Sequence, residues 1–361
     1  MVYKVIGLMS GSSLDGLDIV YAHLEEVRGE WKFEIKNAEC LSYDTDWIKE
    51  LHTLQNLTVA EYLKLNTRYG KYLAEAVNDF IERNSLHHQI DFIASHGHTA
   101  YHDPLHHTSV ELGCGATLAA HTQLPVISEL RAMDVALGGQ GAPIVPIGDK
   151  LLFNDYDFWL NIGGIVNISI KKETTLEAFD ICPGNQLLNT LAMRAGKEMD
   201  FNGAIAREGN LLLGELFQLN DQQYYRQAPP KSLSNKEAQE LVFPILLESS
   251  HNTSDLLHTS VHHIAEQIAA VIKSHKNPHP GKILVTGGGA FNSFLIDVLR
   301  EKLKDENVSI IIPDATVIQF KEALVMALIG TLRWREEINV LASVTGASHN
   351  SINGALWMGR N

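Results

Sequence analysis

Short apolar runs separated by tight clusters of glycine predict β-strands that end in turns. The glycines between two runs supply the backbone angles that such turns need. The predicted strands are residues 5–10, 17–24, 158–162, 166–170 and 283–286. Longer stretches in which apolar residues recur every three or four positions predict helices. The predicted helices are residues 59–83, 186–195, 260–274, 294–303 and 319–335.

This mixture of strands and helices indicates an α/β protein. A strand–glycine–strand unit occurs once at residues 11–16 and again at Gly163-Gly164, in different halves of the chain. The repetition predicts two related domains that face a cleft. We expect the first domain to span residues 1–130 and the second to begin at residue 131, ahead of a Gly/Pro-rich segment.

Composition and charge narrow the class of protein. The chain has 361 residues, of which 45% are hydrophobic and 20% charged, as in globular proteins. Its 29 Lys and Arg residues against 43 Asp and Glu residues give a net charge of −14, which repels phosphate backbones. We therefore expect no nucleic-acid partner.

The chain also lacks the features of a membrane or exported protein. Its two long uncharged stretches, residues 112–128 and 338–359, are broken by Gly, His, Thr, Asn and Ser, so we expect neither to span a membrane. Three widely spaced cysteines do not predict a disulfide framework. We expect a cytoplasmic protein.

The glycine clusters have a possible chemical use. Backbone N–H groups left free in a tight glycine turn can converge on a phosphate, and nearby hydroxyls add donors. Common phosphate and nucleophile patterns are absent from the sequence: G-x-x-x-x-G-K-[ST], G-x-G-x-x-G, a kinase H-R-D loop and the esterase G-x-S-x-G. Each cluster alone is compatible with a purely structural turn, whereas three together favour a shared nucleotide site.

Six segments in order resemble the anhydro-N-acetylmuramic acid kinases. They are GLMSGSSLDGLD at 7–18, SHGHT at 95–99, GGQGAP at 138–143, NIGG at 161–164, FD at 179–180 with PGN at 183–185, and TGGG at 286–289. The resemblance implies the actin/hexokinase/Hsp70-like fold, with two ribonuclease-H-like domains around a central nucleotide cleft. It also implies that residues 324–361 pack back on the first domain, which leaves 131–323 as the second.

The resemblance implies an unusual reaction that uses ATP and Mg²⁺. Water opens the 1,6-anhydro bridge of anhydro-N-acetylmuramic acid, and the released O6 takes the γ-phosphoryl group. The products are N-acetylmuramic acid 6-phosphate and ADP, within peptidoglycan recycling. By the same resemblance the partners are the amino sugar and ATP, and a homodimer is possible.

Asp180 is the candidate general base that takes a proton from the attacking water. It follows a strand-like run, 176–179, and precedes the Pro183-Gly184 turn. The catalytic aspartate of the resembled family falls on this position. The alternative from the sequence alone is that Asp180 caps the helix beginning near Asn185.

The resemblance implies a nucleotide site built from the glycine clusters. Its predicted members are Gly11, Ser12, Ser13, Leu14, Asp15, Gly16, Leu17, Asp18, Gly163, Gly164, Gly184, Asn185, Gly287, Gly288 and Gly289. Asp15 and Asp18 could place Mg²⁺ through water, because this ion keeps much of its hydration. Alternatively, the two aspartates only stabilise the hairpin turn.

The sugar site is expected to hold the lactyl carboxylate and the hydroxyls of the substrate. Its predicted members are Ser95, His96, Gly97, His98, Thr99, Arg131 and Glu322. Arg131 offers the local positive charge that an acidic protein needs, although a surface ion pair is the alternative. Lys231 either approaches the nucleotide or is a solvated loop charge. Five histidines lie within residues 96–107, without the spacing of a zinc site.

Four positions depart from the commonest family pattern. Ile181-Cys182 replaces Thr-Gly after the catalytic aspartate, Asn189 stands where Asp is usual, and His98 where Gln is usual. Two rival functions keep the fold: a kinase for another small molecule, or an ATP-driven module of the Hsp70 or actin type. Convergence of the sugar-site residues would favour the anhydro-sugar kinase.

Overall fold

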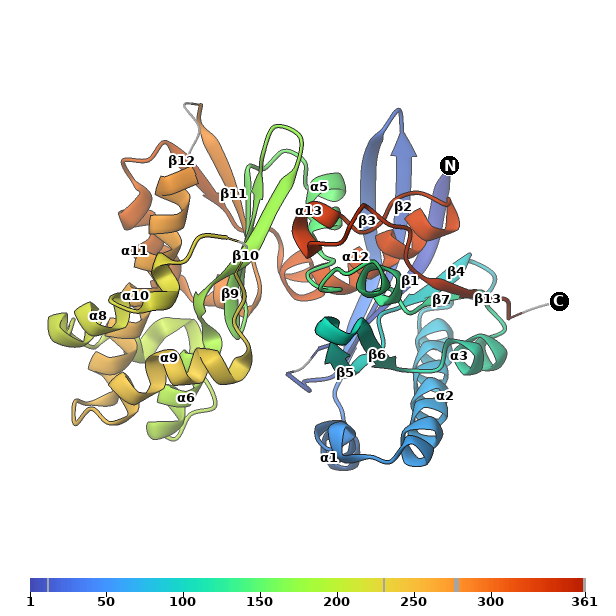
Figure 1. Cartoon of the computed structure of the whole chain (residues 1–361), viewed down its shortest axis with the longest axis horizontal. Helices are drawn as coiled ribbons and strands as arrows, with labels where there is room; N and C mark the ends of the chain where they lie inside the picture. The colour runs from blue at the N-terminus through green and yellow to red at the C-terminus, as the bar shows by residue number, and fades with distance from the viewer. Residues whose placement is uncertain (12, 230, 276–278, 360–361) are drawn as a thin grey trace. The chain divides into compact units, whose positions relative to one another are not determined.

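A computed structural model describes residues 1–11, 13–229, 231–275 and 279–359 (Figure 1). The chain divides into two compact units. Unit 1 contains Met1–Phe153 and Phe320–Asn361, and unit 2 contains Asn154–Gln319. Each unit has its own sheet, helices and buried core.

Unit 1 is built on a six-stranded sheet in the order β13-β7-β4-β1-β2-β3. Strands β1 to β3 form an antiparallel meander, β4 and β7 run parallel to β1, and β13 closes the edge antiparallel to β7. The strands are β1 Val2–Ser10, β2 Leu17–Val27, β3 Glu30–Leu41, β4 Phe92–Ser95, β7 Val126–Ser128 and β13 Ala355–Trp357. A separate hairpin pairs β5 His98–Asp103 with β6 Thr108–Leu112.

Helices cover both faces of the unit 1 sheet. Ile6 and Leu8 of β1 share a buried cluster with the apolar face of α2, whereas Gly7 between them lies against Ala323 of α12. This alternation follows from the period of two along a strand. The α-helices of unit 1 are α1 Thr45–His52, α2 Val59–Arg83, α3 Gly115–Thr122, α4 Ala132–Ala136, α5 Pro146–Leu152, α12 Ala315–Trp334, which begins in unit 2, and α13 Ala342–Thr345.

Unit 2 is built on a five-stranded sheet in the order β10-β9-β8-β11-β12. Its strands are β8 Phe158–Ile162, β9 Ile165–Lys171, β10 Leu176–Pro183, β11 Gly281–Thr286 and β12 Val308–Ile311. Its helices include α6 Asn185–Arg194, α7 Ala204–Arg207, α8 Leu213–Asn220, α9 Asn235–Leu247, α10 Thr253–His275 and α11 Ser293–Leu303. The apolar faces of α6, α10 and α11 form one buried cluster with the strands.

The two units repeat one topology. In each, three antiparallel strands come first, and two parallel strands follow by way of helical connections. Counting strands in chain order within each main sheet, both sheets have the arrangement 3-2-1-4-5, with β13 added at the edge of the first. The predicted pair of ribonuclease-H-like domains is thereby confirmed at the level of topology.

The units divide at different residues from the expected 130/131 and 323/324. The segment after residue 130 belongs to unit 1, because its side chains bond there. Arg131 donates to Thr99, and Thr345 donates to Asp134. Phe153 packs on Phe33 with ring centroids 5.2 Å apart. The return to unit 1 comes inside helix α12, between Gln319 and Phe320.

Helix α12 has the length and apolar character of a membrane-spanning helix, with a mean hydropathy of 1.5 in its most apolar window. However, 78% of that window is buried inside the protein. The helix packs through Gly330 against Ala94 of β4. Its apolar surface is therefore explained by packing within the chain.

Candidate active site

Asp180 lies at an irregularity in the edge strand β10. It pairs with Asn167 of β9, and the next pairing joins Cys182 to Val166, so Ile181 is the extra residue of a β-bulge. Ile181 is 1% exposed and belongs to the apolar core of unit 2. A bulge redirects the side chains beside it, and bulges are common at functional sites. Ile181 thus anchors the bulge that sets the direction of Asp180.

A segment outside the sheet holds Asp180 in place. The backbone N–H of Asp180 donates to the carbonyl of Lys231 at 3.2 Å, and its own carbonyl accepts from the Tyr224 hydroxyl at 2.7 Å. The Leu233 N–H donates to Oδ2 of the carboxylate at 2.8 Å. Burial raises the pKa of the Asp180 carboxyl above its usual value, and the Leu233 N–H partly opposes this effect.

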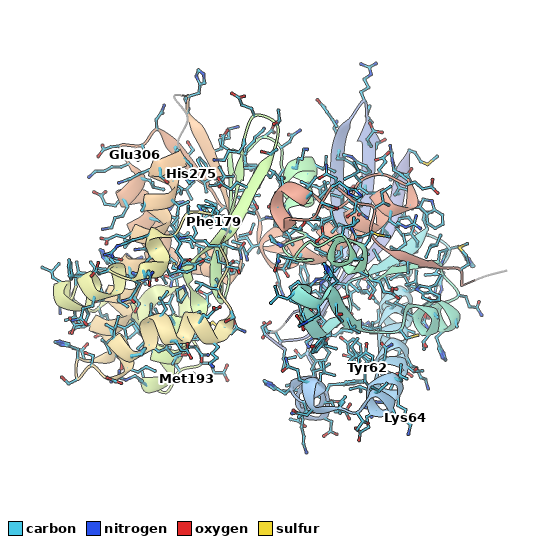
Figure 2. The ribbon with its side chains drawn as sticks, in the orientation of Figure 1. Tyr62, Lys64, Phe179, Met193, His275 and Glu306 are labelled. Carbon is cyan, nitrogen blue, oxygen red and sulfur yellow. The ribbon has the colours of Figure 1, made fainter. Side chains whose placement is uncertain are left out.

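The alternative role of Asp180 as a helix cap is wrong. Helix α6 begins at Asn185 with Gly184 as its N-cap, and no side chain caps it. Lys231, left open between a nucleotide contact and a solvated loop charge, is a half-buried loop residue with partners inside unit 2. Its ammonium donates to the Tyr224 carbonyl at 3.2 Å and lies 4.5 Å from the centre of the Tyr224 ring. Figure 2 labels Phe179, the residue before Asp180, whose ring lies 5.9 Å from the same ammonium.

The predicted glycines of unit 2 meet at one corner of the sheet, where β8, β10 and β11 end. Gly184 and Asn185 donate their N–H groups to the carbonyls of Gly164 and Gly163, each at 2.8 Å. A Cβ on Gly287, where φ is +81°, would lie 2.5 Å from Oδ1 of Asn161. We call this set, Gly163, Gly164, Gly184, Asn185 and Gly287 to Gly289, the glycine corner.

Some N–H groups of the glycine corner bond to carbonyls within the protein, and others do not. The N–H groups of Gly184 and Asn185 hold the β8–β9 turn against the start of α6 and are engaged within the protein. Gly288 begins the short 3₁₀ helix Gly288–Phe291 and is exposed. The first N–H groups of a helix have no partner inside that helix. Gly288 is therefore the member best placed to donate to an anion, whereas Gly289 is buried against Ile162.

The predicted phosphate loop connects β1 to β2 in unit 1. Ser10 and Leu17 form the last pair of the hairpin, and Leu14 adopts a left-handed conformation with φ of 59°. Ser13 and Asp15 are exposed, while Gly16 packs so closely on the Leu41 carbonyl that a Cβ would lie 2.5 Å from it. Ser12, another predicted contact, lies outside the described residues.

Asp18 sits one step inside the hairpin, opposite Cys40 of β3. Burial raises the pKa of its carboxyl, the hydrogen bond from Cys40 lowers it, and the nearby charge of Asp15 raises it. Two neighbouring carboxylates at the edge of a phosphate loop fit a Mg²⁺ ion held through water. Across residues 1–11, 13–229, 231–275 and 279–359, no group of three or more His, Cys, Asp or Glu side chains is placed to hold a metal. Asp15 and Asp18 therefore suit an ion that keeps most of its water ligands, and not one coordinated by protein atoms alone.

The predicted sugar segment 95–99 continues from the carboxyl end of β4. A pocket of about 40 Å³ lies beside it in unit 1. Its lining residues are Asn66, Ser95, His96, Gly97, Glu111, Gly113, Cys114, Gly115, Ser128 and Glu129. Ser95 is 1% exposed, and its hydroxyl has no hydrogen-bond partner within the described part of the chain. Such a group is a candidate for bonding a ligand or a water molecule.

His98 belongs to a buried chain of hydrogen bonds rather than to the exposed loop. Its Nδ1 lies 2.9 Å from the Ser10 hydroxyl, which lies 2.7 Å from the Tyr43 hydroxyl, which in turn lies 2.6 Å from that of Tyr69. Burial lowers the pKa of His98 to about 4. The neutral imidazole thus bonds to the residue that precedes the phosphate loop, which gives this departure from the family pattern a structural role.

Arg131 is buried in unit 1 with its own partners, so the predicted alternative of a surface ion pair is wrong. Its guanidinium donates to the Gly141 carbonyl at 2.7 Å and to the Thr99 hydroxyl at 3.0 Å. It also lies 3.5 Å from the Glu111 carboxylate and 3.2 Å from Nδ1 of His102. Burial lowers the pKa of Arg131, and burial likewise raises that of Glu111.

Other predicted residues have simpler settings. Glu322 is exposed on α12 beside Lys321, which is buried in an ion pair with Asp149 at 2.5 Å. Asn189 is half-buried on α6. Cys182 is fully buried, and burial raises the pKa of its thiol, which argues against a reactive role.

The structure also assigns neighbours that the sequence did not indicate. Tyr224 and Leu233 bond to Asp180, and Glu111 pairs with Arg131. Ser10 is a further such neighbour, bonded to His98. The sequence does hint at Ser10, because it directly precedes the predicted phosphate loop. Nothing local in the sequence marks the other three, since their importance comes from contacts across the fold.

A family model for anhydro-N-acetylmuramic acid kinase matches residues 3–359 of the chain. The chain belongs to the anhydro-N-acetylmuramic acid kinase family. Two relatives that carry this name come from Bacillus thuringiensis (strain Al Hakam) and Bacillus cereus (strain 03BB102), each 31% identical. The alignments cover 98% and 97% of this chain and 98% of each relative. The family expected from the six segments is thereby confirmed.

Solved structures show weaker likenesses. The activator of the 2-hydroxyisocaproyl-CoA dehydratase from Clostridium difficile, with bound ADPNP, has a TM-score of 0.46 and 15% identity, covering 93% of this chain and 96% of that one. Component A of the (R)-2-hydroxyglutaryl-CoA dehydratase from Acidaminococcus fermentans has a TM-score of 0.47 and 15% identity, covering 90% and 96%. Neither likeness is close enough to support an assignment for this anhydro-N-acetylmuramic acid kinase family member.

Proposed function

We propose that this protein is an ATP-dependent kinase that opens the 1,6-anhydro ring of anhydro-N-acetylmuramic acid and phosphorylates O6. The observation that carries the proposal is the family match over residues 3–359, nearly the whole chain. The products are N-acetylmuramic acid 6-phosphate and ADP, and the reaction belongs to peptidoglycan recycling. Three free cysteines suit a reducing cytoplasm, where we place the protein.

Asp180 is the proposed general base. Oδ2 accepts the Leu233 N–H, and Oδ1 has no hydrogen-bond partner among the described residues, so Oδ1 is available to a water molecule. The carboxylate takes a proton as water attacks C1, the C1–O6 bond breaks, and its electron pair stays on O6. Because burial raises the pKa of Asp180, its carboxylate is a stronger base than an exposed one.

Phosphoryl transfer follows when O6 attacks the γ-phosphorus of ATP and ADP leaves. This step depends on positioning and on stabilising negative charge. We assign these tasks to the loop residues Ser13 to Asp18 and to the glycine corner. Asp15 and Asp18 would hold Mg²⁺ through water, and the ion would supply charge neutralisation at the phosphates.

Sugar recognition is assigned to the residues around Arg131. A guanidinium has five N–H groups, and the described protein partners of Arg131 number four: Gly141, Thr99, Glu111 and His102. This leaves capacity for a bond to the lactyl carboxylate, while Thr99 is oriented by its own bond to Arg131. Ser95 brings a hydroxyl that has no partner among the described residues, and His96, Gly97, His98 and Glu322 complete the proposed set.

The substitution Asp180→Asn tests the base. Asn keeps the acceptor for Leu233 and removes the basic oxygen, so kcat should fall by about 10²- to 10⁴-fold. The measurement is ADP release that depends on the sugar, together with mass analysis of the sugar product. The product should carry one phosphoryl group and one water more than the substrate.

Asp157→Asn is the matched control, because Asp157 also accepts one backbone N–H in unit 2, from Lys282 at 2.9 Å. It should retain the wild-type kcat. Near-normal turnover by Asp180→Asn would show that Asp180 is not the general base. A wild-type product that gained a phosphoryl group without water would instead overturn the proposed reaction.

A further inference from the structure

The edge of the unit 2 sheet is covered at one point, beside Asp180. Strand β10 is the outermost strand, with β9 on one side only. The N–H and C=O of a residue in an antiparallel strand point to the same side. At Asp180 both groups bond to residues beyond the sheet, to Lys231 and Tyr224. The segment that covers this edge therefore bonds to the residue proposed as the base.

Three residues of this segment act together, and we call Tyr224, Lys231 and Leu233 the Asp180 brace. The Tyr224 hydroxyl bonds to the Asp180 carbonyl, and the Tyr224 carbonyl accepts from the Lys231 ammonium. Lys231 and Leu233 then contribute the main-chain bonds to Asp180. Tyr224 is 8% exposed and packs in one apolar cluster with Leu233 and Ala238.

The brace is more than a cover for an edge strand, because it fixes the carboxylate itself. Leu233 occupies Oδ2, which leaves Oδ1 as the proton acceptor. The bulge at Ile181 interrupts the pairing with β9 next to Asp180, so the sheet alone does not fix the orientation of this residue. The bonds from the brace replace the support that a regular strand pair would give.

We propose that Tyr224 is a positioning residue for the hydrolytic step. Its hydroxyl holds the backbone carbonyl of Asp180, so that Oδ1 of Asp180 faces the attacking water. This inference rests on the proposed function. Tyr224 acts through Asp180 and does not itself transfer a proton. Its ring, packed against the Lys231 ammonium, keeps the whole brace in one arrangement.

The test is Tyr224→Phe, which removes the hydroxyl and keeps the ring. Small displacements of a reacting group are costly, and we expect kcat to fall about 10-fold with the KM values for sugar and ATP almost unchanged. Loosening the brace weakens the Leu233 bond that lowers the pKa of Asp180. The acid limb of the kcat profile should therefore move to higher pH.

Tyr225→Phe is the matched control. The Tyr225 hydroxyl is the next one along the chain and bonds to Nε2 of His263 at 3.0 Å, away from Asp180. Both variants lose one part-buried tyrosine hydrogen bond in unit 2, so urea unfolding should show similar destabilisation. Tyr225→Phe should nevertheless keep the wild-type kcat and the wild-type acid limb.

The outcomes separate the two proposals. If the wild-type protein forms no phosphorylated, ring-opened sugar, the proposed function fails. If it forms that product and Tyr224→Phe matches Tyr225→Phe in kcat and in pH profile, the positioning role of Tyr224 is overturned. A lower kcat with a displaced acid limb in Tyr224→Phe alone supports it.

Discussion

Several titratable residues near the proposed site are buried. Burial lowers the pKa of His96 and of His98 to about 4, so both are neutral at pH 7. Arg131 and Lys321 are buried cations, each paired with a carboxylate, from Glu111 and Asp149. Burial therefore keeps the two histidines neutral, so lowering the pH should disturb this region by charging them.

His98 gives a pH prediction for stability. The unfolded chain binds a proton at this residue near pH 6.5, whereas the folded protein does so only near pH 4. The stability from neutral His98 is therefore present above pH 6.5 and is lost as pH falls through that window to about 4. The gap corresponds to at most about 3 kcal/mol of unfolding free energy. As the pH falls across that window, His98→Gln should lose less unfolding free energy than the wild-type protein. Urea unfolding at several pH values provides the measurement.

His87→Gln is the control for this prediction, because His87 is exposed and pairs with Glu82 at the surface. It should keep the wild-type dependence on pH. Gln at position 98 retains an acceptor for Ser10, so the substitution removes the titration without removing the hydrogen bond. Identical slopes for His98→Gln and the wild-type protein would contradict the account of His98.

At the scale of elements, the glycine corner shows how strand ends bring separate glycine turns together. The ends of β8 and β11 meet because these strands are parallel neighbours, with Thr286 opposite Asn161. The start of α6 is tied to the β8–β9 turn by the N–H groups of Gly184 and Asn185. Crowding of Gly287 against Asn161 makes glycine necessary at that position.

Gly287→Ala tests the glycine corner. Its Cβ would meet Asn161 Oδ1 at 2.5 Å, so the backbone must shift and Gly288 and Gly289 must move with it. We expect the KM for ATP to rise about 10-fold or more, because displaced donors lose their geometry for the phosphates. Steady-state kinetics with varied ATP provide the measurement.

Gly196→Ala is the control, since Gly196 also has a positive φ, +70°, with nothing within 4 Å of an added Cβ. It carries the same kind of backbone strain without the crowding. Its KM for ATP should match that of the wild-type protein. Equal changes in KM from both substitutions would show that the corner has no special part in binding ATP.

The sequence predicted elements better than it predicted their contacts. Apolar runs marked both hairpins, and helix α2 has the predicted bounds Val59–Arg83. The third strand of unit 1, β3, is not among the predicted strands because it has no glycine cluster beside a continuous apolar run, although its alternation of polar and apolar residues is itself a strand pattern. The brace around Asp180 could not be predicted, since Tyr224 is 44 residues away in sequence and the bulge at Ile181 has no local signal.

At the scale of the whole molecule, the proposed site residues are distributed over two units that share one topology. Unit 1 contains the phosphate loop and the sugar residues around Arg131, and unit 2 contains Asp180 and the glycine corner. The net charge of −14 and the pairing of the buried cations leave little free positive charge for two anionic ligands. In the proposed function, backbone N–H groups and Mg²⁺ would therefore supply much of the attraction for ATP.

The coupling of ring opening to phosphorylation is the central claim, and one measurement tests it directly. The protein is incubated with ATP, Mg²⁺ and anhydro-N-acetylmuramic acid in ¹⁸O-labelled water, and the sugar product is analysed by mass spectrometry and NMR. We expect ¹⁸O on C1 and an unlabelled O6 that carries the phosphoryl group. A phosphorylated sugar with its anhydro bridge intact, or with ¹⁸O at C6, would contradict it.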